Sequence, residues 1–324
     1  MSMLDKIAPR YTTTVSRIGA VFVALSIVVL SSVGVVKAVD QPKMGLAISP
    51  PTFELAANAG DVLKNSLRVD NLVDIPLEVS VDARNFTALG EEGGIDLTPA
   101  GEDNFSLASW ISVSPKKVTI PPHESKTFDY TIDIPINASP GGRFGSIIFQ
   151  TAPSTELSGQ SGVAISQEVG TLIFVKIAGA VTEKASVAGF TTINNIHNKG
   201  PVDFDIRIKN DGNVHFKPKG TITISNFFGK QIATIPINEQ NVLPGATRKM
   251  DASWGSGMFF GRYNATLSLV YGKDGQVITA STAFWGFPYK LMGLILLVLV
   301  LVGAALYPLR HRIWRAFKIL FGKE

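Results

Sequence analysis

The chain has 324 residues, which is enough for two ordinary domains together with targeting segments. Its hydrophobic fraction of 45% excludes a disordered chain, and the absence of cysteine excludes disulfides, cysteine-ligated zinc and a cysteine nucleophile. Ten of the 30 Lys and Arg residues lie outside residues 39–289, so this middle segment carries 20 basic against 24 acidic residues, a net charge of −4. The basic pI therefore belongs to the ends of the chain, and no nucleic acid is expected as a partner.

The first element in chain order is an apolar run at Ile18–Val36 that follows Lys6, Arg10 and Arg17. The residues at its end, up to Ala38, resemble a small-residue cleavage site. We expect residues 1–38 to be a signal peptide, with an uncleaved signal anchor as the alternative. Both versions export residue 39 onward. An exported β-protein without cysteine is typical of a bacterial or archaeal envelope.

Apolar and polar side chains alternate in several segments between residues 45 and 285, which is typical of strands with one wet face. Turn signals such as Asn210-Asp211-Gly212 and Lys273-Asp274-Gly275 separate these segments, and no long helical pattern interrupts them. The alternation predicts strands at 77–83, 128–134, 171–177, 202–208 and 263–271. We therefore expect an all-β fold of two immunoglobulin-like β-sandwich domains in tandem, residues 39–181 and 182–286.

A weak internal repeat supports this division. The matched pairs are Val69-Asp70-Asn71 with Ile208-Lys209-Asn210, Pro122–Lys126 with Pro244–Arg248, and Gly142-Arg143-Phe144 with Gly261-Arg262-Tyr263. The first copy is longer between its Asn and its Pro, which predicts an insertion at Leu89–Ser106 in the first domain.

The last element is an uncharged apolar run at Leu291–Tyr307. As a helix it is about 25 Å long, close to the hydrocarbon thickness of a bilayer. Aromatic residues precede it and basic residues follow it, as the positive-inside rule expects. The pattern predicts one transmembrane helix at 287–308 and a basic cytoplasmic tail at 309–324. The ectodomain would then be extracellular.

Catalytic and metal-binding patterns are missing from the sequence. The histidines, His123, His197, His215 and His311, do not combine with carboxylates at metal-ligand spacing, and no nucleophile elbow, zinc-protease helix or P-loop occurs. We therefore predict no enzyme, no cofactor, and no catalytic, cofactor-binding or metal-ligating residues. Asp203 and Asp205 are interpreted as the wet face of a strand, and Gly255–Gly257 as a turn.

Three weaker candidates have a structural and a functional interpretation. The first is the acidic stretch with Glu91, Glu92, Asp96, Glu102 and Asp103, which is a solvated loop tip or a ligand loop, with the loop tip favoured. The same choice applies to Pro153–Gly162. Trp110, Trp254 and Tyr271 are expected to be core residues and not a ligand platform.

Several motifs in this order resemble the WxL-interacting proteins of Gram-positive surfaces. They are Ile48–Phe53 (ISPPTF), Val118–Lys126 (VTIPPHESK), Gly141–Phe149 (GGRFGSIIF), a second β-domain, one helix and a basic tail. The resemblance implies that the first domain associates with peptidoglycan and the second with a host or partner protein. No Trp-x-Leu motif occurs here, so the chain would be the interacting partner of a WxL-type protein.

The sequence thus favours a membrane-anchored cell-surface protein with a non-enzymatic binding role. Its expected partners are a cell-wall polymer such as peptidoglycan, a surface protein, or both, in attachment or adhesion. Two alternatives stay open: a pilus-type assembly chaperone, which would use strand edges to complete subunits, and an envelope enzyme with an unrecognised site.

Overall fold

The computed structural model describes residues 45–99, 104–153 and 166–307, which belong to one compact unit, Met44–Glu324. The predicted signal segment 1–38 and the predicted tail 309–324 lie outside the described residues. So do Glu102, Asp103 and residues 154–162 of the second candidate loop.

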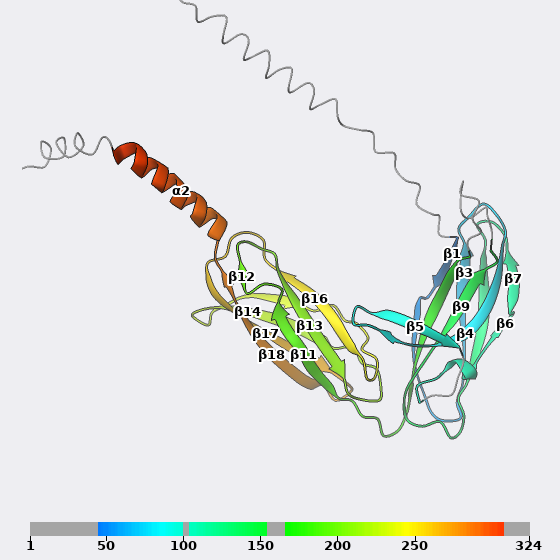
Figure 1. Cartoon of the computed structure of the whole chain (residues 1–324). Helices are drawn as coiled ribbons and strands as arrows, with labels where there is room; N and C mark the ends of the chain where they lie inside the picture. Colours follow the sequence, from blue (N-terminus) through cyan, green and yellow to red (C-terminus); the bar gives the residue numbers. More distant parts are fainter. Residues whose placement is uncertain (1–44, 100–103, 154–165, 308–324) are drawn as a thin grey trace, which may run out of the picture. The chain divides into compact units, whose positions relative to one another are not determined.

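Strands β1 to β10 form two sheets around one core, which we call the first sandwich (Figure 1). One sheet has the order β1 (Leu46–Ser49), β3 (Val62–Asn71), β8 (Ser125–Asp133), β6 (Ile111–Ser114). The other has the order β2 (Thr52–Ala57), β10 (Glu168–Ile177), β9 (Gly141–Thr151), β4 (Leu77–Leu89), β5 (Gly94–Pro99), and β7 (Lys117–Ile120) also pairs with β4. A short 3-10 helix, η1 (Ala108–Trp110), precedes β6.

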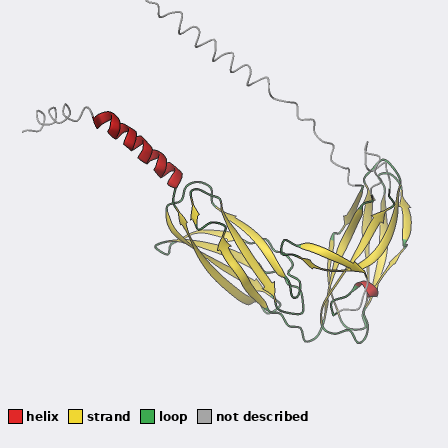
Figure 2. Ribbon diagram, in the orientation of Figure 1, coloured by secondary structure: helices red, strands yellow, loops and turns green. Residues whose placement is uncertain are grey.

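Strands β11 to β18 form two further sheets around a separate core, which we call the second sandwich. Its smaller sheet has the order β11 (Ala185–Thr192), β13 (Val202–Asn210), β16 (Thr247–Trp254). Its larger sheet has the order β12 (Ile196–His197), β18 (Gln276–Gly286), β17 (Gly261–Tyr271), β14 (Lys219–Asn226), β15 (Gln231–Pro236). Helix α2 (Tyr289–Leu306) follows β18 (Figure 2).

The two sandwiches share one topology. In each sandwich, the first strand pairs antiparallel with a strand of one sheet, as β1 does with β3 and β11 with β13. The next strand then crosses to the other sheet and pairs parallel with the last strand, as β2 does with β10 and β12 with β18. The weak sequence repeat therefore corresponds to a repeated fold.

A buried asparagine occupies the same place in both copies. Asn71 ends β3 and Asn210 ends β13, with side chains 1% and 0% exposed. The Asn71 amide donates to the carbonyls of Ile120 and Pro121, both at 3.0 Å, and the Asn210 amide donates to that of Val242 at 2.9 Å. Each asparagine thereby holds the turn that leads into the next strand, because buried carbonyls need donors.

The all-β, immunoglobulin-like fold is confirmed, and the predicted strands correspond to β4, β8, β10, β13 and β17. The stretch Leu89–Ser106, expected as an insertion, contains β5 in its described part, but β15 takes the same place beside β14 in the second sandwich. The described elements of the first sandwich without a counterpart in the second are η1, β6 and β7. The predicted division between 181 and 182 falls in the connection from β10 to β11 and stays a prediction. Within the described residues, no helix combines the length and hydropathy that a membrane span requires.

Candidate functional site

The tip of the β4–β5 hairpin contacts the second sandwich through two acidic side chains. Glu91 forms an ion pair with Arg207 of β13 at 3.0 Å, and Glu92 with Lys249 of β16 at 2.9 Å. The Lys249 amide also donates to the Glu91 carbonyl at 2.8 Å. A hydrogen bond to the Glu92 carboxylate raises the pKa of Lys249. The side chains of Glu92 and Glu91 remain 70% and 38% exposed in these ion pairs, and Asp96 of the same hairpin is exposed. The loop tip is therefore solvated, and it also contacts the second sandwich, which the sequence did not predict.

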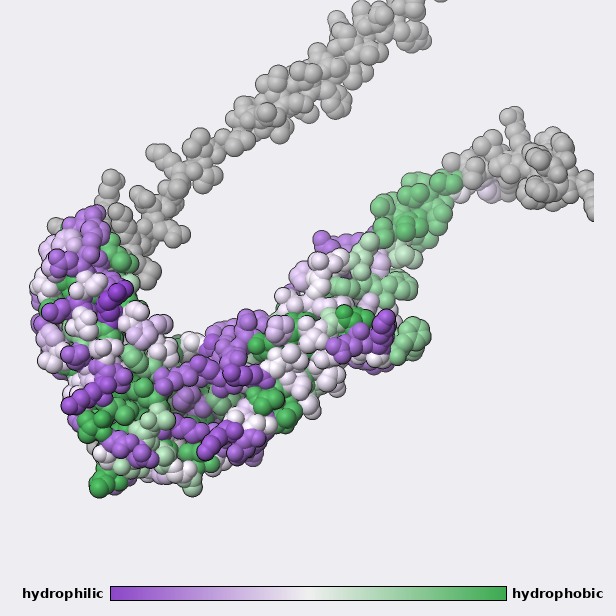
Figure 3. All heavy atoms as spheres, turned by 180° about the vertical axis from the view of Figure 1, so that it is seen from behind, coloured by the Kyte–Doolittle hydropathy of each residue, from purple (hydrophilic) through white to green (hydrophobic). Residues whose placement is uncertain are grey.

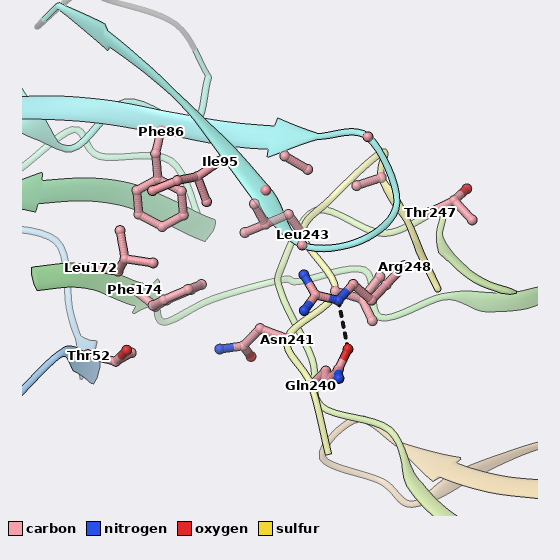
Figure 4. A pocket seen from close by; sticks show the side chains of 16 residues that line it. Thr52, Phe86, Ile95, Leu172, Phe174, Gln240, Asn241, Leu243, Thr247 and Arg248 are labelled. Carbon is pink, nitrogen blue, oxygen red and sulfur yellow. Dashed lines mark hydrogen bonds between the residues drawn. The ribbon is translucent and has the colours of Figure 1, made fainter. Parts of the chain in front are cut away.

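A pocket of about 240 Å³ lies beside this hairpin (Figure 4). One wall is apolar and comes from the first sandwich, with Phe86 and Phe174 among its residues. The opposite wall comes from residues 240–248, where the Arg248 Nε–H donates to Gln240 Oε1 at 2.8 Å. Gly93 has a φ of +90°, and a Cβ there would meet the Arg248 guanidinium at 1.7 Å, so glycine suits this close approach.

The two phenylalanines of the apolar wall belong to an aromatic cluster. Phe86, Phe144 and Phe174 pack together, and the His215 ring lies 5.6 Å from the Phe144 ring and 5.0 Å from the Phe174 ring. Burial lowers the pKa of His215 to about 4, so this imidazole is neutral at neutral pH. Its Nδ1 is buried with no hydrogen-bond partner in the described part of the chain.

A second set of polar contacts joins β2 to the segment around His215. Glu54 forms an ion pair with Lys217, and the Asn241 amide donates to the same carboxylate at 3.0 Å. Burial pushes the pKa of Glu54 upward, but these hydrogen bonds and the Lys217 charge outweigh it and lower the pKa below its usual range. The carboxylate therefore stays ionised beside the neutral imidazole.

The lining of the pocket is mostly apolar, with few ionisable groups. Its lining contains no carboxylate and no histidine, so Arg248 is its one ionisable side chain. Small-molecule sites usually measure about 300–1,000 Å³, which is more than this pocket provides. No group of His, Asp and Glu residues among those described is placed to hold a metal ion.

The described histidines do not come together. His123 Nε2 lies 2.8 Å from Asp74 on the surface, His197 is buried in β12, and His215 joins the aromatic cluster. Tyr271 is buried, and Trp110 and Trp254 pack against the two cores, as expected of core residues.

Sequence reasoning did not find the pocket or the aromatic cluster. Phe144 was visible as part of the Gly-Arg-Phe repeat, but its neighbours Phe86, Phe174 and His215 are far from it in the sequence. Only the pairing of β9 with β4 and β10 places two of these phenylalanines beside Phe144. A single sequence carries no signal for such long-range contacts.

Comparisons with known proteins give structural likenesses alone. No protein-family model and no curated protein matches the chain. A chain from a chaperone–tip adhesin complex of CFA/I fimbriae is 14% identical over 75% of this chain and 100% of its own, with a TM-score of 0.41. The class 5 fimbriae chaperone CfaA is 14% identical over 75% and 100%, with a TM-score of 0.39. A chain of the Salmonella enterica SafA pilin–SafB chaperone complex is 10% identical over 76% and 98%, with a TM-score of 0.39.

These three solved structures are of a fimbrial chaperone or of chaperone complexes with a tip adhesin or a pilin. Their identities and TM-scores are too low to transfer a function, so the function of this chain is derived from its own residues.

Proposed function

We propose that the chain is a membrane-tethered protein of the cell surface that binds another surface protein without catalysing a reaction. The uncharged apolar run Leu291–Tyr307 carries this proposal. Most of this run forms α2, which does not by itself meet the requirements of a span within the described residues. Its large apolar side chains from Leu291 to Val302 are between 39% and 64% exposed, and Figure 3 displays hydrophobic residues along the described helix. A helix that is apolar on all sides needs an apolar environment, and a bilayer provides one.

We assign the orientation of α2 from the basic residues on its C-terminal side. Basic residues follow Tyr307 in the sequence, which favours a cytoplasmic C-terminus and an extracellular pair of sandwiches. We assign the binding role to the sandwiches, which are the folded β-domains of the described chain.

The partner that suits the sandwiches best is a polypeptide. Strands β6 and β15 are each paired on one side within the described residues, with β8 and β14 respectively. Such edges accept an added strand from another protein. The resemblance to WxL-interacting proteins adds a WxL-type surface protein as a specific candidate, and peptidoglycan stays a second candidate ligand.

The tether is tested by moving charge into α2. The native full chain should stay in membranes washed with alkaline carbonate, whereas the double variant Val298→Asp/Leu299→Asp should be released, because each carboxylate at a span centre costs about 2.5–3.5 kcal/mol. Val277→Asp, at an exposed position outside α2, is the matched control and should stay in the membranes. Release of the native chain by carbonate would reject the tether.

The partner is tested with the full chain in native membranes. Photo-crosslinkers placed at Thr234 on β15 and at Ser112 on β6 should form adducts with a surface protein if an edge binds it. Isolated cell-wall sacculi should not sediment the detergent-solubilised chain. If the chain sediments with sacculi and forms no protein adduct, the partner is a wall polymer and not a protein.

The open edges of β6 and β15 also favour a second candidate, a pilus-type assembly chaperone. The similar solved chains come from complexes of a chaperone with a tip adhesin and with a pilin. A chaperone role predicts that deletion of the gene depletes a surface fibre. Unchanged fibres in the deletion strain would discard this candidate.

A further inference from the structure

The register of the larger sheet in the second sandwich brings four separate segments to one end. Asn226 of β14 pairs with Tyr263 of β17, and Gly261 pairs with Gly286 of β18. Trp285 pairs with Ile196 of β12. The β14–β15 turn, the loop before β17, the segment 193–200 and the start of α2 therefore lie at the same end of this sheet.

This end carries exposed aromatic and apolar side chains from three of these segments. We call Phe227, Phe228, Met258, Phe260, Trp285 and Phe287 the aromatic end; all are exposed. Phe228 is 88% exposed and Phe260 is 74% exposed, so these rings do not contribute to the core. Phe260 also lies 6.2 Å from Phe287, just before α2. A soluble surface rarely gathers so many large apolar groups without a partner.

The charges within the segments that form the aromatic end are all of one sign, although Asp203 of β13 lies next to them, with its carbonyl accepting from the Ile193 amide at 3.1 Å. The segments 193–200, 226–232, 254–263 and 284–290 contain Lys199, Lys230, Arg262 and Lys290 and no Asp or Glu. The segment 39–289 as a whole is acidic, so this composition is local. Aromatic rings together with basic side chains are typical of surfaces that meet anionic lipid headgroups.

Helix α2 is attached directly to the aromatic end. The Phe287 amide donates to the His197 carbonyl at 2.9 Å, and the Lys290 amide donates to Asn198 Oδ1 at 3.1 Å. Only Phe287 and Pro288 separate β18 from α2. A bilayer that takes up α2 therefore reaches the aromatic end within a few residues.

We infer that the aromatic end inserts into the headgroup region of the same leaflet that α2 enters, with the basic residues on lipid phosphates. This inference rests on the proposed tether and adds to it a second membrane contact, made by parts of the chain far from α2 in sequence. The second sandwich would then be seated on the membrane surface by the β14–β15 turn and the loop before β17.

The experiment uses the full chain in vesicles of phosphatidylcholine and phosphatidylglycerol. Because the native chain contains no cysteine, single-cysteine variants can carry one environment-sensitive fluorophore each. Phe228→Cys and Phe260→Cys report on the aromatic end. Val277→Cys, exposed at the opposite end of the same sheet, is the matched control. Leu297→Cys reports on α2.

Lipids brominated near the top of the acyl chain should quench the labels at 228 and 260 but not the label at 277. If the label at 297 is quenched while those at 228 and 260 behave like 277, the inference is overturned and the tether stands. If the label at 297 is not quenched, the tether itself fails.

Adding Lys230→Glu and Arg262→Glu should reduce quenching at 228 by about two-fold or more, because each basic residue near an anionic surface contributes to binding. Equal quenching with and without these charges would overturn the role given to the phosphates.

Discussion

At the scale of single residues, the buried asparagines explain why the two copies of the repeat share short motifs. Asn210 donates to the carbonyls of Val214 and Val242, both at 2.9 Å, and accepts from the Gly212 amide at 2.9 Å. Asn71 makes the corresponding bonds in the first sandwich. An amide side chain provides two donors and one acceptor at once, which no apolar residue of this size can do.

Asn210→Ala should lower the free energy of unfolding by about 2–4 kcal/mol, because it leaves buried carbonyls and an amide without partners. Urea unfolding of the second sandwich, followed by tryptophan fluorescence, measures this change. Asn195→Ala at an exposed position is the control and should change the free energy by less than about 0.5 kcal/mol. An equal effect of both substitutions would contradict the role of the Asn210 side chain.

His215 makes the free energy of unfolding depend on pH. Its pKa is lowered to about 4 by burial, from about 6.5 in the unfolded chain. The charges facing it are Glu54, Lys176 and Lys217. Between pH 6.5 and 4 the His215 side chain is protonated more in the unfolded state than in the folded state. The folded state is therefore favoured fully above pH 6.5, and its free energy of unfolding falls as the pH is lowered.

The free energy of unfolding should therefore fall by about 2 kcal/mol between pH 6.5 and 5 because of His215 alone. Denaturant titrations at both pH values measure it, and His215→Gln should remove this part of the slope. His123→Asn is the control, since His123 lies on the surface with a φ of 57° that asparagine tolerates. An unchanged slope in His215→Gln would assign the dependence to other groups.

At the scale of elements, the β4–β5 hairpin and its counterpart in the second sandwich carry different residues at their tips. The hairpin ends in Glu91 and Glu92, whose carboxylates meet basic side chains of β13 and β16. The equivalent β14–β15 hairpin ends in Phe227 and Phe228, which are exposed. The same topological position thus carries an acidic contact in one copy and an aromatic surface in the other.

Glu92→Lys should speed hydrogen exchange of the Lys249 amide by about two- to five-fold, because like charges replace an exposed ion pair that holds the hairpin tip. Adding Lys249→Glu should restore part of the protection by reversing the pair. Asp96→Lys, an exposed change on the same hairpin, should leave exchange at Lys249 unaltered. Equal exchange in all four proteins would mean that the ion pair does not hold the hairpin.

At the scale of the whole molecule, each sandwich has a core of its own. The first contains Phe128 and Phe149, whose rings are 4.9 Å apart, and the second contains Phe204 and Phe284. No residue belongs to both of these clusters within the described chain. We therefore expect the predicted division at 181/182 to separate two units that unfold separately.

Phe149→Ala should destabilise the first sandwich by about 3–5 kcal/mol through the lost ring and the cavity it leaves. Hydrogen exchange resolved by segment should then increase in β8 and β9 while β17 keeps its protection. Phe204→Ala is the reciprocal variant and should affect β17 and spare β9. Loss of protection in both sandwiches from either change would identify one cooperative unit.

The sequence by itself determined the strands with clear alternation (β4, β8, β10, β13 and β17), the repeat and the apolar segment of α2. Each of these depends on neighbours in the chain: alternation sets the wet face of β4 or β17, and an uninterrupted apolar run needs no partner to be recognised. The same local information did not reveal the partners of Glu91 and Glu92, because an acidic loop carries no signal for the distant strands that it contacts.

Only the tertiary structure decided where distant residues meet. Arg207 and Lys249 meet the hairpin through the folding of β13 and β16, and His215 meets Phe144 and Phe174 across more than 40 residues of chain. The aromatic end is gathered by the register of β14, β17 and β18. Strand register is set by the burial of whole faces, a property of the assembled sheet that no single segment contains.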